Sequence, residues 1–207
     1  MRLTAEHVAR LEKFMNRIQS ETYPEIPRDL HSKLTHQMME RIFPCFTLPP
    51  GARVLDVGCG QGVALEEFKV RGFNAIGIAL NPVDVDACRA KGFEVREMEQ
   101  SFLDFGDGEF DMVWCRHFLE HSIFPYFTLA EFRRVLKPNG WLYVEVPAPD
   151  TASQHQANPN HYSVLGKSLW IELIRRSGYN LIQSVNIGLN VGTGPDMYWA
   201  FLQQRKP

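Results

Sequence analysis

Apolar residues in the first fifty positions recur every three or four places, as they do along one face of a helix. This spacing predicts an amphipathic helix at residues 3–18 and a second helix at 30–43, which Pro44 ends. The proline-bearing segment 23–27 is expected to interrupt the chain between them. After residue 50 the pattern changes, so a different architecture is expected from there on.

From residue 53 onward, short apolar runs alternate with segments of helical spacing. The runs expected to form strands are residues 54–57, 74–78, 93–95, 110–115 and 141–146. The helices expected between them are residues 64–71, 82–91 and 126–136, and they end near Gly72, Gly92 and the Asn139-Gly140 pair. This alternation predicts parallel strands joined by crossover helices.

The C-terminal part has a different order of elements. A helix is expected at 165–176, and strands at 181–187 and 197–203 are joined by the segment 188–195. Since no helix separates these strands, they are expected to pair as an antiparallel hairpin. The predicted fold is an α/β three-layer sandwich whose mostly parallel sheet ends in that hairpin.

The sharpest local signal is the glycine-rich segment 54–62, where a strand runs into a helix. Glycines let the backbone turn tightly and approach a ligand, and a helix N-terminus attracts negative groups. A turn that needs glycine only for its geometry is the alternative. A dinucleotide-binding turn is disfavoured, because Val63 stands where its third glycine belongs and Asp56 would repel a pyrophosphate. The same carboxylate would attract an ammonium group.

Four segments, in order, resemble the motifs of the class I S-adenosylmethionine (SAM)-dependent methyltransferases. They are residues 54–62, 109–115, Leu119-Glu120-His121 and 132–140, which together extend over residues 53–147. The resemblance implies a Rossmann-like fold, SAM as the cofactor, and methyl transfer to a small-molecule acceptor. It also implies that residues 1–48 form an N-terminal helical cap or lid on a SAM-binding domain of residues 49–207, within one compact unit.

The resemblance also assigns cofactor-binding residues. They are Asp56, Gly58, Cys59, Gly60, Ala79, Leu80, Asn81, Glu99, Gln100, Cys115 and His117. The backbone of the glycine-rich turn and the main chain at 115–117 would line the methionine end, where Asp56 orients the ammonium group. Glu99, with Gln100 beside it, would meet the adenine amino group, and a solvated loop carboxylate is the alternative for Glu99.

Position 79 departs from the family pattern. The family usually carries Asp or Glu there to hold both ribose hydroxyls, whereas the side chain of Ala79 offers no acceptor. Asn81 offers one acceptor for the ribose. Weaker SAM binding, a modified SAM and lost activity all stay open, so a non-catalytic or divergent SAM-fold binding or regulatory module is the alternative function. An NAD-linked oxidoreductase is disfavoured by Val63.

Methyl transfer mainly requires alignment and a dry site, and a base if the acceptor is a hydroxyl. Histidine is the base expected near neutral pH. His161 comes first, then His155, with His121 as the alternative, since all three follow strands at the sheet edge where ligands bind. His161-Tyr162-Ser163 also resembles a stretch found in small-molecule and sugar methyltransferases. A structural hydrogen bond is the alternative for each histidine, and oxygen is the expected methyl acceptor.

Composition narrows the partners. The 207 residues, 44% of them hydrophobic, fit one globular domain. A net charge of −2 provides no basic excess for a phosphate backbone, so a small molecule is expected as the partner and nucleic acid is not.

The remaining expectations concern metal, membrane and location. The four cysteines are widely spaced and fit reduced thiols, so no metal site is expected. No apolar run is long enough for a bilayer and no signal peptide is recognisable, so a cytoplasmic protein without a membrane partner is expected. The oligomeric state stays open.

Overall fold

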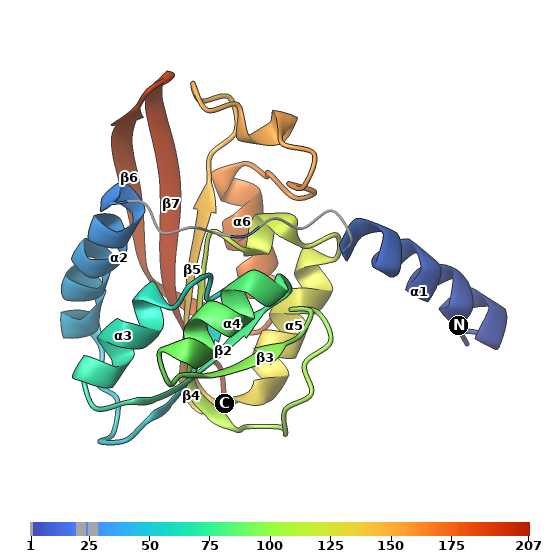
Figure 1. The fold of residues 1–207 in the computed structure, drawn as a ribbon, viewed down its shortest axis with the longest axis horizontal. Coiled ribbons are helices and arrows are strands. Elements are labelled where there is room, and N and C mark those ends of the chain that lie inside the picture. The colour runs from blue at the N-terminus through green and yellow to red at the C-terminus, as the bar shows by residue number, and fades with distance from the viewer. Residues whose placement is uncertain (1, 20–23, 25–28) are drawn as a thin grey trace.

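The described residues form a seven-stranded sheet with helices on both faces (Figure 1). The structure, a computed structural model, describes residues 2–19, 24 and 29–207. The strands are β1 (Arg53–Val57), β2 (Asn74–Ala79), β3 (Glu94–Glu97), β4 (Phe110–Arg116), β5 (Leu136–Pro147), β6 (Tyr179–Val191) and β7 (Gly194–Arg205). The helices are α1 (Ala5–Gln19), α2 (Asp29–Ile42), α3 (Val63–Val70), α4 (Pro82–Ala90), α5 (Pro125–Val135) and α6 (Lys167–Arg176). Short 3-10 helices cover Phe43–Cys45 (η1), Leu119–His121 (η2) and His155–Ala157 (η3).

The strand order is β3-β2-β1-β4-β5-β7-β6. β1 pairs in parallel with both β2 and β4, and β7 lies antiparallel between β5 and β6. The α/β class and the antiparallel hairpin at one end of the sheet are therefore confirmed. Because the order reverses between β1 and β4, the connections diverge there and a crevice opens beyond the carboxyl ends of these strands.

Strand β1 shows how the sheet divides the core. Leu55 packs in the cluster that contains α5 and α6, whereas Val54 packs in the cluster that contains α2 and α3. Successive strand residues point to opposite faces, so Asp56 faces the same side as Val54. On that side Met39 of α2 is fully buried, which makes α2 part of the core. Helix α1 instead projects from the body (Figure 1), and Met15 near its end is buried.

One boundary differs from the sequence prediction at the end of α5. The helix predicted at 126–136 gives way directly to strand β5 at Leu136, so the Asn139-Gly140 pair caps no helix and that expectation is wrong. Asn139 has a left-handed φ of 62° inside β5, where the register with β4 shifts. A Cβ on Gly140 would lie 2.9 Å from the carbonyl oxygen of Lys137, so the irregular strand itself requires this glycine.

A second difference lies in the C-terminal hairpin. The connection predicted at 188–195 is mostly strand, because β6 continues to Val191 and pairs there with Gly194 of β7. A two-residue turn suits the twist of paired strands. Gly188 and Asn190 are poor strand formers, but pairing along the whole hairpin overrides their propensity.

The last two observations concern the segment 23–27 and the length of the helices. Apart from Pro24, the break predicted at 23–27 lies outside the described residues. Within residues 2–19 and 29–207, no helix has both the length and the apolar character to cross a bilayer.

Candidate functional site

Two adjoining cavities lie beyond the carboxyl ends of β1, β2 and β4. The narrower one, about 90 Å³, is bordered by the start of α4, by the residues after β3 and by the end of α1. The wider one, about 420 Å³, is bordered by the glycine-rich turn, η2 and the loop after β5. Gly58, Gly60 and His121 line both cavities, so a ligand that occupies both must pass these three residues.

The glycine-rich turn is held by β2. The backbone N–H groups of Gly58 and Cys59 both donate to the carbonyl oxygen of Ile78, at 2.9 and 3.0 Å. Gly58 has a left-handed φ of 72°, and a Cβ there would lie 2.3 Å from the ring of Phe118. Glycine is therefore required at this position by both conformation and space. The two N–H groups are used inside the fold, so any contact of Gly58 or Cys59 with the methionine end must come from other atoms.

Asp56 is the charged group at the end of β1. Its side chain is 2% exposed and lines the wider cavity. Its charge also contributes to the raised pKa of the Cys59 thiol, after the hydrogen bond with Cys88 and burial. A carboxylate in this position presents negative charge to the cavity and fits an ammonium group.

The end of β2 carries no carboxylate, but a nearby helix does. Ala79 lines the narrower cavity together with Leu80 and Asn81. The Asn81 Oδ1 accepts a hydrogen bond from the backbone N–H of Val83 at 3.0 Å and caps α4, so the acceptor expected to serve a ribose already serves the helix. Asp84, in the first turn of α4, is 3% exposed and lines the same cavity.

Glu99 and Gln100 both line the narrower cavity, and their side chains make different hydrogen bonds. The carboxylate of Glu99 accepts from the backbone N–H of Ser101 at 2.6 Å and from its hydroxyl at 3.3 Å, and burial raises the pKa of Glu99. Gln100 donates through Nε2 to the carbonyl of Phe118 at 3.0 Å. Its Oε1 is buried and makes no hydrogen bond within the described residues. This acceptor at the narrower cavity fits an amino group of a ligand.

A buried charged group lies behind the wider cavity. Glu145 of β5 lies 2.6 Å from His117 Nε2 and 2.9 Å from Arg116 Nε, and it accepts from the Tyr143 hydroxyl at 2.6 Å. Burial alone would raise the pKa of Glu145, but Arg116, then His117 and Tyr143, lower it to about 2. Burial, followed by Arg116, lowers the pKa of His117 to about 4. At neutral pH the pair is therefore an ionised carboxylate and a neutral imidazole.

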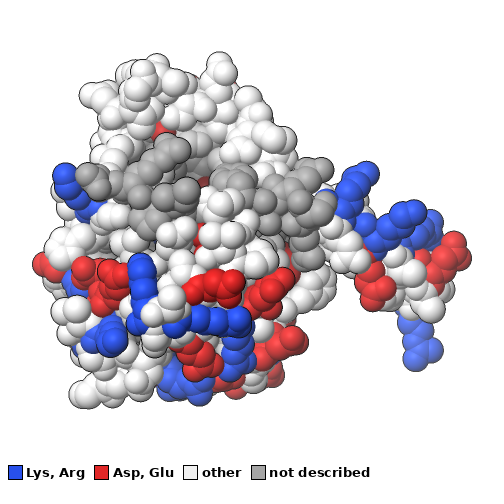
Figure 2. Space-filling model, in the orientation of Figure 1, with Lys and Arg blue, Asp and Glu red and all other residues white. Residues whose placement is uncertain are grey.

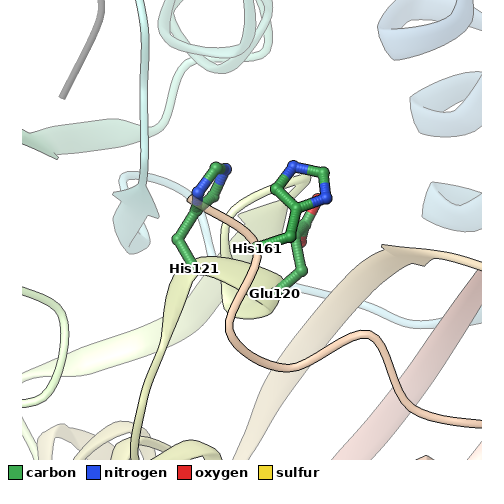
Figure 3. A group of neighbouring side chains, drawn as sticks. All are labelled: Glu120, His121 and His161. Atoms are coloured by element: carbon green, nitrogen blue, oxygen red, sulfur yellow. The ribbon is translucent and has the colours of Figure 1, made fainter. Parts of the chain in front are cut away.

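The three histidines predicted as bases lie together at the wider cavity. The rings of His121 and His161 are 4.8 Å apart, and those of His155 and His161 are 5.8 Å apart. Figure 3 shows His121 and His161 beside Glu120, which precedes His121 in η2. Burial lowers the pKa of His121, and burial with the charges of His121 and His155 lowers that of His161 to about 4.

His155 has a different environment from the other two. Its Nε2 lies 3.0 Å from both carboxylate oxygens of Asp196 on β7, and that side chain also accepts from the Ser153 hydroxyl at 2.7 Å. Asp196 is 4% exposed. An imidazole that donates through Nε2 to a buried carboxylate keeps its lone pair on Nδ1, which is the arrangement of a general base.

Most of the residues predicted for the site lie together. Of the cofactor set, Cys115 lines neither cavity, and its side chain is fully buried in the core cluster on the α5 and α6 side, so the role expected of its main chain stays a prediction. Sequence reasoning missed Asp84, Glu145 and Asp196 as site residues. The Asn81-Pro82 helix start places Asp84 in a first turn and could have identified it, whereas no local pattern marks the other two.

Comparisons with known proteins show the family to which the chain belongs. A family model described as a methyltransferase domain matches residues 30–186. A ubiquinone biosynthesis O-methyltransferase of Hahella chejuensis is 35% identical over 101 residues, 45% of this chain and 42% of that protein. A 24-methylenesterol C-methyltransferase 2 of Oryza sativa subsp. japonica is 31% identical over 151 residues, 69% of this chain and 41% of that protein. The chain therefore spans about two fifths of the length of these curated relatives.

Solved structures show the same fold at lower identity. A SAM-dependent methyltransferase from Archaeoglobus fulgidus has a TM-score of 0.69 and 21% sequence identity, over 84% of this chain and 94% of that chain. At this identity the likeness concerns the fold alone.

The buried His117 predicts a loss of stability in mild acid. Its folded pKa of about 4 lies below the ordinary value of 6.5, so the unfolded chain binds more protons between these values. The contribution of His117 to the free energy of unfolding is therefore fully present well above pH 6.5 and is lost as the pH drops towards 4. This loss amounts to about 2 kcal/mol between pH 7 and 5. His117→Gln should flatten the dependence of unfolding free energy on pH by that amount, measured by urea titration at several pH values.

The matched control is His7→Gln, on the exposed part of α1. It should leave the slope of stability against pH as in the wild type. An equal slope in wild type and His117→Gln between pH 7 and 5 would contradict the neutral state of His117.

Proposed function

Because this chain belongs to the class I SAM-dependent methyltransferases, we propose that it transfers a methyl group from SAM to a hydroxyl oxygen of a small molecule. The observation that carries the proposal is the junction of the two cavities at Gly58, Gly60 and His121. A cofactor in the narrower cavity would reach the wider one there, beside the histidines. Alignment at such a junction is the main requirement of the reaction.

The residues at the two cavities fit SAM. Asp56 would hold the methionine ammonium, and the buried Oε1 of Gln100 would accept from the adenine amino group. Asp84 would hold the ribose hydroxyls in place of the missing acid at Ala79, since its carboxylate lines the same cavity. When bound, SAM supplies a methyl group that its sulfonium has already activated.

His155 is the proposed general base. Its Nε2 is held by Asp196, so Nδ1 would take the proton of the acceptor hydroxyl, and the carboxylate would stabilise the imidazolium that forms. The sequence ranked His161 first, but a pKa of about 4 makes that imidazole a weak proton acceptor. We therefore place His155 first among the three candidates, with His161 and His121 after it.

The surface and the relatives support a small acceptor. Basic and acidic side chains lie next to one another on α1 and in the lower part of the face seen in Figure 2, and the net charge of −2 favours a small acceptor over a phosphate backbone. The name of the Hahella chejuensis relative indicates an O-methyltransferase, and a hydroxylated ring compound is the corresponding acceptor proposed here. Helix α1 would act as a lid, because Met15 and Ile18 line the narrower cavity. All four cysteines are free thiols, which supports a cytoplasmic location.

The second candidate function is a divergent SAM-fold module without turnover, or one for a modified SAM. The observation that favours it is Ala79, which leaves the end of β2 without a ribose acceptor. If Asp84 does not supply that acceptor, binding of ordinary SAM is weak.

Thermal stability tests the cofactor. SAM and S-adenosylhomocysteine should raise Tm, because a ligand that binds only the folded state stabilises it, by about 2.7 kcal/mol at a hundred times Kd. Asp56→Asn should remove most of this shift, since it deletes the charge opposite the ammonium group. NAD should give no shift, and a shift with NAD but not with SAM would contradict the assignment.

Calorimetric SAM binding tests Asp84. Asp84→Asn should raise Kd about tenfold or more, because hydrogen bonds to a charged group contribute about 1.5–3 kcal/mol. Ala79→Asp in the Asp84→Asn background should recover affinity, since it restores a carboxylate at the end of β2. The control is Asp86→Asn, on the exposed side of α4. Equal affinities of Asp84→Asn and Asp86→Asn would refute this role of Asp84.

Steady-state kinetics with an acceptor found by screening hydroxylated ring compounds tests the base. His155→Gln should lower kcat by about 10²–10⁴, and SAM affinity should barely change. Asp196→Asn should also lower kcat, because it no longer orients the imidazole. The exposed His36→Gln serves as control. Near-full turnover of His155→Gln would exclude it as the base.

A further inference from the structure

Glu120, His121 and His161 offer two imidazoles and one carboxylate to a single point. One ligand atom of each lies within 4.8 Å of the others, and Figure 3 shows the three side chains side by side. They come from two elements, since Glu120 and His121 belong to η2 and His161 lies in the loop between β5 and α6. All three line the wider cavity.

We propose that Glu120, His121 and His161 bind a divalent cation of the first transition series, which holds the acceptor oxygen. The substrate part of this inference rests on the proposed function, whereas the cation site itself does not. Two imidazoles with one carboxylate favour zinc or manganese over magnesium or calcium, which prefer ligand sets made of oxygen.

A hydrogen bond orients the ring of His121 as metal-binding histidines are usually oriented. His121 lies with Nδ1 2.8 Å from the carbonyl oxygen of Asn160, so Nδ1 carries the hydrogen and the lone pair is on Nε2. Histidines that bind metals usually donate their other N–H to a carbonyl or carboxylate in this way. Nε2 of His121 is therefore available to a cation.

His161 shows the complementary arrangement. Its Nδ1 is buried and makes no hydrogen bond within the described residues. With its hydrogen on Nε2, this neutral imidazole would keep its lone pair on Nδ1. A buried lone pair that accepts no hydrogen bond is unfavourable, and a bound cation would replace the missing interaction.

The two elements are fastened to each other. The backbone N–H of Ser163 donates to the Glu120 carbonyl at 2.9 Å, and the Ser163 hydroxyl donates to the Ser122 carbonyl at 2.6 Å. Glu120 is itself 2% exposed. A cation about 2.1 Å from each ligand atom needs these atoms within about 4.2 Å of one another, so a small movement of one side chain completes the site.

The position of the site gives the cation a role. His121 stands at the junction of the two cavities, and three protein ligands leave coordination positions open for an acceptor. A hydroxyl bound to the cation loses its proton more easily. The proton would pass to His155, whose ring lies 5.8 Å from that of His161. The oxygen lone pair would then form the new bond to the methyl carbon while the bond from that carbon to the SAM sulfur breaks, so that S-adenosylhomocysteine leaves with the electron pair.

Calorimetric titration of the tag-free, chelator-treated chain with Zn²⁺, without SAM or acceptor, tests the site. We expect one Zn²⁺ per chain with a Kd at or below the micromolar range. Glu120→Gln and His161→Gln should each weaken binding at least tenfold, and the exposed His36→Gln should not. Absorption of bound Co²⁺ gives a second readout, with d–d bands that both site variants lose.

The outcomes separate this inference from the proposed function. No stoichiometric Zn²⁺ binding, or equal affinity in wild type, Glu120→Gln and His161→Gln, overturns the cation site even if SAM binds. If one variant does not fold, judged by its thermal unfolding, the other decides. Zn²⁺ binding at these residues without any binding of SAM or S-adenosylhomocysteine would support the cation site and contradict the proposed function.

Discussion

The carbonyl of Ile78 accepts hydrogen bonds from the backbone amides of both Gly58 and Cys59, and the geometry of the site depends on this shared contact. It ties the end of β1 to β2, so the chain has to reverse at once, with Gly58 in a left-handed conformation under the ring of Phe118. Asp56, just before the turn, then faces the wider cavity. The same ring that excludes any side chain at position 58 borders the narrower cavity.

Two imidazoles that line the wider cavity are each paired with a carboxylate of a neighbouring strand. His117 follows β4 and meets Glu145 of β5, whereas His155 follows β5 and meets Asp196 of β7. The antiparallel hairpin therefore contributes to the site as well as to the sheet. The first pair also includes Arg116, which lies 2.9 Å from Glu145, and burial followed by the charge of Arg116 lowers the pKa of His117 to about 4.

Local patterns in the sequence were sufficient for the parallel strands and for the glycine-rich turn, because both depend on near neighbours in the chain. The long hairpin was underestimated, since Gly188 and Asn190 join β6 only through pairing with β7. Asp196, the carboxylate partner of His155, lies 41 residues from it along the chain, and no spacing rule connects such positions. The sequence offers Asn81 as an acceptor for a ribose, whereas in the structure its Oδ1 accepts from the backbone N–H of Val83 and caps α4.

The central claim is that the two cavities hold SAM through residues that this chain places around one junction. A crystal structure with S-adenosylhomocysteine tests it most directly. The account predicts the adenine amino group at Oε1 of Gln100, the ribose hydroxyls at Asp84 and the ammonium group at Asp56. A ligand bound outside these cavities, or bound with its adenine in the wider one, would contradict the account.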